Sequence, residues 1–301
     1  MTQIEQSIVQ KTGIDGGKMS VTVKNLSYVY MKGTAFEKKA LDDVSLNIET
    51  GEFVGIIGHT GSGKSTLVQH FNGLLKPTAG SVFINGEELK GNRAKELKRK
   101  VGIVFQYPEH QLFEETVYKD IAFGLVKRGE SKDVIDEKVK KTAKALGLSE
   151  ELLEKSPFEL SGGQKRRAAM AGILVLQPEI LVLDEPAAGL DPKGRDEIFG
   201  LISGLHKNLK MTVVLVSHSM EDIAKYVDSV IVMNRGRIEM SGPTRSIFSK
   251  TDRLEEMGLA VPQITYLLKR LKERIPDIND SIISVSEARK ELEKYLRKAD
   301  G

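Results

Sequence analysis

The segment GHTGSGKS, Gly58 to Ser65, constrains the fold of this chain more than any other part of its sequence. It follows the short apolar run FVGII and precedes STLVQHFNGLL, which has helical spacing, so it joins a predicted strand to a predicted helix. The pattern G-x-x-x-x-G-K-[ST] in this setting is typical of a phosphate-binding loop. A glycine turn with an incidental lysine is the alternative, and the strand and helix on either side disfavour it.

The residue types of this loop suit a nucleoside triphosphate. Glycines let backbone N–H groups approach phosphate oxygens closely, and the N-terminus of the following helix favours anions. We expect Lys64 to reach the β- and γ-phosphates of ATP and the Ser65 hydroxyl to bind Mg²⁺. The predicted ATP-binding residues of this segment are Gly58, His59, Thr60, Gly61, Ser62, Gly63, Lys64, Ser65 and Thr66.

A second apolar run, ILVLDE, ends in two adjacent acids, Asp184 and Glu185. Carboxylates at the end of an apolar strand indicate a cation, although a strand running into a solvated acidic turn is the alternative. We expect Asp184 to hold Mg²⁺ through water and Glu185 to polarise the attacking water. Because ILVLDE and TVVLVSH are continuous apolar runs, the sequence predicts a parallel sheet buried on both faces, in an α/β fold.

Composition excludes several classes of protein function. The 301 residues include no cysteine, which excludes disulfides and thiol catalysis. The 45 basic and 42 acidic residues are too evenly balanced to indicate nucleic-acid binding from charge alone. No apolar run approaches the roughly 20 residues that span a bilayer, so any membrane crossing is expected from other subunits. Residues 1–19 lack the apolar stretch of a signal peptide and are interpreted as a flexible leader.

The pentapeptide LSGGQ, Leu160 to Gln164, lies between the loop and the acidic strand. The Ser161 hydroxyl and the N–H groups of Gly162 and Gly163 form a donor-rich helix start suited to a γ-phosphate, although Ser161 also fits a simple helix N-cap. In this order with the other two motifs, the pentapeptide resembles the signature of ATP-binding cassette (ABC) proteins. In that family the signature contacts the ATP held by the other subunit, which implies ATP binding by Ser161, Gly162, Gly163 and Gln164.

Other positions between residues 20 and 243 match the same family. Gln106 resembles the glutamine that touches Mg²⁺ and the lytic water and couples the site to the membrane subunit. His218 resembles the switch histidine at the γ-phosphate, and Asp191 resembles the loop aspartate that signals across the dimer. Tyr30 resembles the aromatic residue that stacks on adenine, and packing within the protein is the alternative. Tyr28, two residues away, is expected to point to the opposite face of the strand.

The resemblance therefore implies a complete nucleotide site. The expected catalytic residues are Glu185, His218, Gln106 and Lys64. The expected metal-binding residues are Ser65, Gln106 and Asp184. Tyr30 and Asp191 complete the expected ATP-binding set.

Two longer segments resemble one branch of the family. GTAFEKKALDDVSL and FQYPEHQLFEETVYKDIAFG are similar to the second type of ATPase subunit in energy-coupling factor (ECF) transporters, which import vitamins and transition-metal ions. The resemblance implies that residues 107–125 form a groove-building helix that receives the transmembrane T component. Leu112, Phe113, Val117 and Ile121 are spaced as one apolar helix face, which plain core packing also explains. Lys165-Arg166-Arg167 and Ala187-Ala188 depart from the family pattern, and no catalytic role is expected of them.

The resemblance also implies the domain organisation. Residues 20–244 are expected to form the nucleotide-binding domain, a P-loop NTPase core of ABC type with an N-terminal antiparallel β subdomain and a helical subdomain at about 107–170. Residues 245–301 carry two amphipathic patterns, the second after a possible capping box from Ser284 to Glu287. Short amphipathic helices cannot bury their faces alone, so this helical C-terminal extension is expected to dock and to serve as a dimerisation element.

These expectations describe a transport ATPase that uses ATP and Mg²⁺, peripheral to the cytoplasmic face of the membrane. A paralogous ATPase subunit is the favoured partner, with a homodimer left open, and an S component that selects the substrate is contacted only indirectly. The alternatives are an importer ATPase for another solute, or a soluble ABC ATPase of DNA repair or translation. A single cassette without a heptad insertion disfavours the soluble class. The basic segment from Lys90 to Lys100 is interpreted as a solvated helix face, so no nucleic-acid partner is expected.

Overall fold

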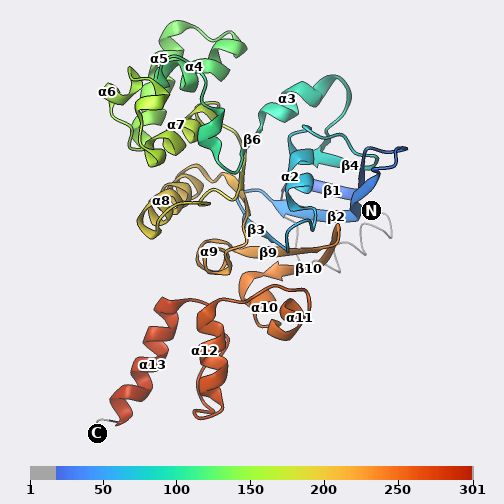
Figure 1. The fold of residues 1–301 in the computed structure, drawn as a ribbon, viewed down its shortest axis with the longest axis vertical. Coiled ribbons are helices and arrows are strands. Elements are labelled where there is room, and N and C mark those ends of the chain that lie inside the picture. Colours follow the sequence, from blue (N-terminus) through green and yellow to red (C-terminus); the bar gives the residue numbers. More distant parts are fainter. Residues whose placement is uncertain (1–17, 300–301) are drawn as a thin grey trace.

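The computed structural model describes residues 18–299. The predicted leader therefore lies outside the described residues, apart from Lys18 and Met19, and Met19 already begins the first strand. Among the described residues, no helix is long and apolar enough to cross a membrane. The chain folds into two sheets, a lobe of helices and a helical C-terminal segment (Figure 1).

The two sheets differ in strand direction. The first is antiparallel, in the order β2-β1-β4-β5, and the second has the order β10-β9-β3-β8-β7-β6, with only β10 antiparallel to its neighbour. The strands of the first sheet are β1 (Met19–Tyr30), β2 (Lys38–Glu49), β4 (Ala79–Ile84) and β5 (Glu87–Glu88). Those of the second are β3 (Phe53–Ile57), β6 (Val101–Val104), β7 (Ile180–Asp184), β8 (Thr212–Val216), β9 (Ser229–Asn234) and β10 (Arg237–Pro243).

Helices cover the second sheet and form the lobe at the top of Figure 1. The core carries α2 (Lys64–Phe71), α3 (Ala94–Arg99), α8 (Pro192–Leu209) and α9 (Met220–Tyr226). The helical lobe consists of α4 (Val117–Arg128), α5 (Lys132–Ala145), α6 (Glu150–Leu153) and α7 (Gly162–Leu174). Short 3₁₀ turns lie at η1 (Gly91–Arg93), η2 (Pro108–Gln111) and η3 (Pro157–Glu159). The C-terminal segment holds α10 (Thr244–Phe248), α11 (Thr251–Glu256), α12 (Gln263–Lys272) and α13 (Val285–Ala299).

Alternation along the buried strand β7 divides the core in two. Ile180 and Val182 pack toward the antiparallel sheet and α2, whereas Leu181 and Leu183 pack toward the helices on the other face. Every residue of this strand is buried, as the continuous apolar run predicted. This two-sided burial fixes the register of the strand, because a slip of one residue would exchange its two faces and misplace the acids at its end.

The segment after Gln106 differs from the expected single helix. It forms the short turn η2, an extended stretch and then α4, which begins at Val117. Val117 and Ile121 are fully buried in the core of the lobe, so the packing alternative accounts for them. Phe113 is instead 62% exposed. The expected apolar face that included these residues was therefore wrong, because the chain turns between Phe113 and the start of α4.

The C-terminal segment divides into two parts. Ile247, Phe248 and Leu254 of α10 and α11 belong to the main core. Beyond them, α12 and α13 project from the opposite end to the helical lobe (Figure 1) and share a small separate cluster centred on Leu268. The Ser284 hydroxyl accepts a hydrogen bond from the Glu287 N–H at 3.3 Å, which forms one half of the expected capping box. Glu287 Oε1 instead accepts a hydrogen bond from Arg245 at 2.8 Å.

Candidate functional site

The carboxyl ends of the parallel strands bring the predicted residues together. Ile56 of β3 and Asp184 of β7 both lie opposite Val216 of β8, and Val104 of β6 lies opposite Leu183. The phosphate-loop segment, Gln106, Glu185 and His218 directly follow these strand ends. They therefore leave one edge of one sheet, which is where open α/β sheets bind ligands.

The phosphate loop owes its shape to two glycines. Gly63 has φ 100°, and an added Cβ there would lie 2.7 Å from the Ala40 carbonyl oxygen. A Cβ at Gly58 would lie 2.3 Å from the Met233 carbonyl oxygen, so neither position accepts a side chain. Lys64 Nζ donates hydrogen bonds to the carbonyl oxygens of Gly58 at 2.7 Å and His59 at 3.1 Å. These contacts hold the ammonium group over the loop.

Burial shifts the pKa values of the charged residues beside the phosphate loop. Burial lowers the pKa of Lys64, and the negative charges of Glu185 and Asp184 oppose that shift. Burial raises the pKa of Asp184, while the Ser65 hydroxyl and the Lys64 charge lower it. A buried carboxylate next to a hydroxyl is an all-oxygen donor pair of the kind that Mg²⁺ prefers, and Mg²⁺ commonly takes only one or two protein carboxylates beside substrate phosphates. The donors at this site therefore fit Mg²⁺.

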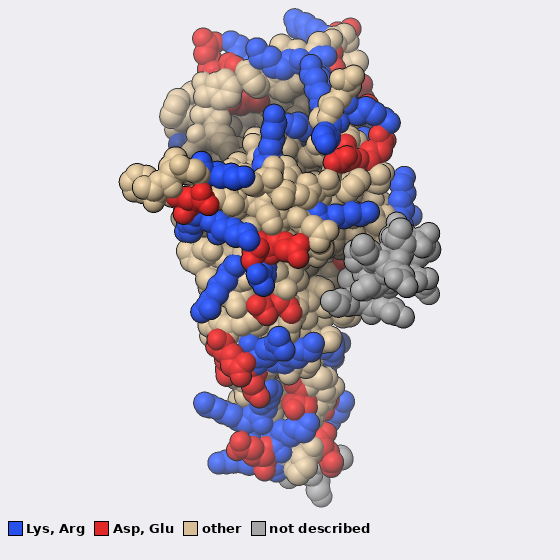
Figure 2. Space-filling view, turned by 90° about the vertical axis from the view of Figure 1, so that its right-hand side faces the viewer, with Lys and Arg blue, Asp and Glu red and all other residues tan. Residues whose placement is uncertain are grey.

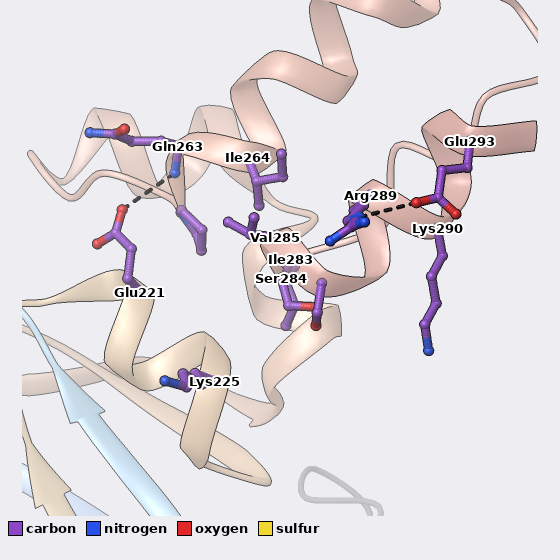
Figure 3. Close-up of a pocket in the computed structure, with 12 residues that line it drawn as sticks. Glu221, Lys225, Gln263, Ile264, Ile283, Ser284, Val285, Arg289, Lys290 and Glu293 are labelled. Carbon is purple, nitrogen blue, oxygen red and sulfur yellow. Dashed lines mark hydrogen bonds and ion pairs between the residues drawn. The ribbon is translucent and has the colours of Figure 1, made fainter. Parts of the chain in front are cut away.

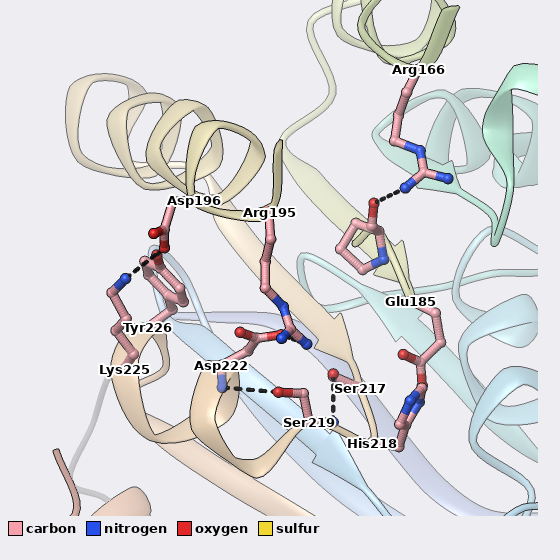
Figure 4. Close-up of polar contacts among 11 residues, drawn as sticks. Arg166, Glu185, Arg195, Asp196, Ser217, His218, Ser219, Asp222, Lys225 and Tyr226 are labelled. Atoms are coloured by element: carbon pink, nitrogen blue, oxygen red, sulfur yellow. Dashed lines mark hydrogen bonds and ion pairs between the residues drawn. The ribbon is translucent and has the colours of Figure 1, made fainter. Parts of the chain in front are cut away.

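Glu185 and His218 form a direct pair. His218 Nδ1 and Glu185 Oε1 are 2.7 Å apart, and both side chains face each other across the sheet edge (Figure 4). Glu185 has a left-handed backbone with φ 53°, and its N–H donates to the Val216 carbonyl oxygen at 2.9 Å. Burial raises the pKa of Glu185, while the contact with His218 lowers it. A carboxyl group with a raised pKa in this position is suited to general-base chemistry.

Tyr30 is the last residue of β1, and its side chain reaches the first turn of α2, the helix that follows the phosphate loop. Its hydroxyl is 3.1 Å from Thr66 Oγ1, and 36% of the residue is exposed. Tyr28 was expected on the opposite face, and this is wrong, because residues two apart on a strand share a face. The two tyrosine rings pack edge to face with centroids 4.7 Å apart. Tyr28 faces the core, and Tyr30 offers its ring to solvent.

The signature residues lie on the helical lobe, at the beginning of α7. Ser161 Oγ accepts a hydrogen bond from the Gln164 N–H at 3.4 Å, and Gln164 Oε1 accepts one from the Ser161 N–H at 2.9 Å. Ser161 therefore caps α7, and this position is also compatible with a contact to a γ-phosphate. Ser161 and Gly162 are exposed. Among the described residues, no hydrogen bond joins Ser161–Gln164 to the phosphate loop. Asp191 caps α8 by accepting from the Gly194 N–H at 2.7 Å.

Sequence reasoning missed one residue of this region, Arg166. Its guanidinium is buried in the junction between α7, η2 and the loop after Glu185, although it lies beside two other basic residues in the sequence. The available signal was its position on α7, where the neighbouring Ala168, Ala169 and Met170 are buried. A basic residue on a mostly buried helix segment calls for an internal partner.

The basic segment from Lys90 to Lys100 forms η1 and α3, with Leu97 buried beneath it. Two of its basic residues form ion pairs, Arg93 with Glu87 and Lys100 with Glu179 at 3.2 Å, and its other basic residues are exposed. Figure 2 shows acidic and basic side chains interspersed on the side of the molecule that faces the viewer. These pairings match the interpretation of a solvated helix face.

Comparison with known proteins places this geometry in context. The family model described as "ABC transporter" matches residues 41–188. The chain is 77% identical over 281 residues to the energy-coupling factor transporter ATP-binding protein EcfA2 of Acetivibrio thermocellus, covering 93% of this chain and 100% of that protein. It is 53% identical to the protein of the same name from Clostridium tetani, covering 92% of this chain and 98% of that protein.

Solved structures agree with the sequence relatives. The structure of cbiO1 from Clostridium perfringens, part of the ABC transporter complex cbiONQ, superposes with a TM-score of 0.71 at 38% identity and covers 84% of this chain and 99% of that chain. A dimeric post-hydrolysis structure of the ATP-binding cassette MJ0796 with ADP and Pi has a TM-score of 0.67 at 31% identity, covering 74% of this chain and 98% of that chain.

Proposed function

Given that this chain belongs to the ATP-binding subunits of energy-coupling factor transporters, within the ABC transporter family, we propose that it hydrolyses ATP between two subunits to drive import of a vitamin or a transition-metal ion. One observation carries the two-subunit part. The exposed signature residues lie on the helical lobe, while Lys64, Asp184, Glu185 and His218 lie at the sheet edge. A second ATPase subunit, placed head to tail, brings its own signature to the ATP held here.

In the proposed mechanism, the phosphate loop and Lys64 bind the triphosphate, and the exposed ring of Tyr30 stacks on adenine. Mg²⁺, held by Ser65, Asp184 and Gln106, would neutralise phosphate charge. Glu185 orients a water and accepts its proton as the water oxygen attacks the γ-phosphorus. The bond to the β-phosphate oxygen then breaks, and ADP and phosphate leave. His218 holds Oε1 of Glu185, which leaves Oε2 as the base. Asp191, which caps α8, would signal to the partner subunit across the dimer.

The proposed contact with the transmembrane T component is an apolar patch on the helical lobe. It consists of Phe113, Phe123 and Val126, and the two phenylalanine rings pack edge to face with centroids 5.0 Å apart. The exposure of all three side chains favours this patch over Val117 and Ile121, which are buried in the core of the lobe. The S component would be reached only through the T component, and the whole chain would sit at the cytoplasmic face of the membrane.

The proposed dimerisation element is the pair α12 and α13. A groove separates it from α9 and is lined by Ile264, Ile283 and Val285 together with charged residues such as Arg289 (Figure 3). Val285 is 72% exposed, so α13 keeps apolar surface beyond its small cluster. We propose that the same segment of a paralogous ATPase subunit, or of a second copy of this chain, covers it.

The Tyr30 role gives a specific prediction. Tyr30→Ala should weaken ATP binding by roughly 5- to 150-fold, because stacking of a base on an aromatic ring contributes about 1–3 kcal/mol. Tyr30→Phe keeps the ring and loses only the contact with Thr66, so its ATP affinity should stay close to that of the wild type. Isothermal titration of the full chain with ATP measures both. Equal losses in the two variants would contradict stacking.

The transporter assignment is tested by the subunits that accompany the chain. Purified from its native membranes with a tag on this chain, the protein should carry a second ATPase and membrane-embedded subunits, identified by mass spectrometry. Ribosomes or DNA in place of membrane subunits would contradict the proposal and favour the soluble ABC class.

A further inference from the structure

The Arg166 side chain occupies the point where three segments of the proposed site meet. The residue is 2% exposed, and its guanidinium donates four hydrogen bonds. Nε and Nη2 donate to the two carboxylate oxygens of Glu109 at 3.1 and 2.8 Å. Nη1 donates to the carbonyl oxygens of Pro186 at 3.1 Å and Ala188 at 2.9 Å. Figure 4 shows the guanidinium pointing at the loop that follows Glu185.

Each joined segment carries one part of the proposed chemistry. Arg166 lies on α7, five residues after Ser161, Glu109 lies three residues after Gln106, and Pro186 directly follows Glu185. Two of these segments also lie close together at Gly189, where an added Cβ would be 3.7 Å from the Tyr107 ring. Through Arg166, the segment that follows Gln106 is therefore joined by hydrogen bonds to both the signature helix and the Glu185 loop.

The form of the contact makes it rigid. The two parallel N–H···O bonds between Arg166 and Glu109 fix the orientation of the guanidinium plane, and only an arginine can make them while also reaching two carbonyls. Burial would raise the pKa of Glu109, but the hydrogen bonds and charge of Arg166 lower it below its usual value. Glu109 therefore stays ionised through the neutral pH range, which keeps its ion pair with Arg166.

We propose that Arg166 is a positioning residue that makes the segment 107–111, the signature helix and the loop after Glu185 respond to ATP as one unit. The proposal rests on the proposed roles of Gln106 and Glu185. Arg166 touches neither the sheet-edge carboxylates nor the phosphate loop by any hydrogen bond of the described residues. Its loss should therefore spare ATP binding and reduce turnover.

The test uses the full chain in the complex that co-purifies with it. Arg166→Gln and Glu109→Gln should each lower kcat at least about tenfold while ATP affinity stays within about twofold. Arg166→Lys keeps the positive charge but cannot make the two parallel hydrogen bonds to Glu109. Its kcat should lie between those of these variants and that of the wild type. The double variant should be no worse than the poorer single variant, because both remove one contact. Arg167→Gln is the matched control: its guanidinium pairs at 3.2 Å with the half-exposed Glu197, and kcat should stay within about twofold.

Hydrogen exchange gives a readout that a purely structural role would not move. With a non-hydrolysable ATP analogue, the wild-type complex should change its exchange both at residues 58–66 and at residues 107–113. In Arg166→Gln the first response should remain and the second should disappear. A retained response at 107–113, or none in the wild type, would overturn the proposal. If Arg166→Gln does not fold, Glu109→Gln decides, because it removes the charge of Glu109 without changing the side-chain shape. A wild-type complex that does not hydrolyse ATP would instead overturn the proposed function.

Discussion

The Glu185→Gln variant is expected to hydrolyse ATP at least about 100-fold more slowly than the wild type and to accumulate as an ATP-bound dimer. The substitution removes the base, whereas an amide oxygen can still accept the contact that His218 makes with Oε1 at 2.7 Å. Binding through the phosphate loop should therefore persist and closure should be trapped. Phosphate release and light scattering of the ATP-loaded subunits measure the two effects.

The same variant should change the pH profile. Because burial raises the pKa of Glu185, the base becomes protonated, and kcat should fall, at a higher pH than for an ordinary glutamate. The residual activity of Glu185→Gln should lack this acid limb. Glu179→Gln is the matched control, since Glu179 precedes the other end of β7 and pairs with Lys100 on the surface. Full turnover in Glu185→Gln would contradict the proposed base.

The Lys64→Ala variant is expected to lose most ATP binding. A hydrogen bond to a charged group contributes about 1.5–3 kcal/mol, so loss of the ammonium should weaken ATP binding roughly 10- to 150-fold. Turnover should fall further, because the same charge stabilises the transferring phosphoryl group. Titration with ATP and with ADP measures the effect, and ATP should lose more because it adds the γ-phosphate.

Lys76→Ala serves as the control for Lys64. Lys76 follows the same helix, α2, and is exposed, so its removal should leave ATP affinity within about twofold. The melting temperature of Lys64→Ala should stay close to that of the wild type, because the variant loses only the hydrogen bonds from Lys64 Nζ to the carbonyl oxygens of Gly58 and His59. Unchanged ATP affinity in Lys64→Ala would contradict the proposed phosphate site.

Local sequence patterns predicted the strand-edge part of the site. The phosphate loop and the acidic strand end each follow a continuous apolar run, and parallel strands bring such run ends together. These two features could be found because burial on both faces fixes the register of each strand. The α/β fold followed from the same patterns, whereas the role of His218 and the antiparallel first sheet were expected from the family resemblance.

Contacts between distant segments could not be predicted in this way. Arg166 and Glu109 are 57 positions apart, and nothing in either short motif indicates that their side chains meet. Helical spacing also failed between Phe113 and Val117, because it assumed a continuous helix where the chain turns. The misplaced Tyr28 had a simpler cause, since strand periodicity itself puts residues two apart on one face.

The central claim is that each ATP lies between two subunits, and the Ser161 position tests it most directly. The chain has no cysteine, so Ser161→Cys supplies its only thiol, on an exposed residue. In the purified complex with its partner ATPase, labelling of this thiol by a maleimide can be followed on this chain by mass spectrometry. Saturating ATP should slow labelling at least about tenfold, because the partner's ATP would cover the helix start. A labelling rate that ATP leaves unchanged would contradict the shared site.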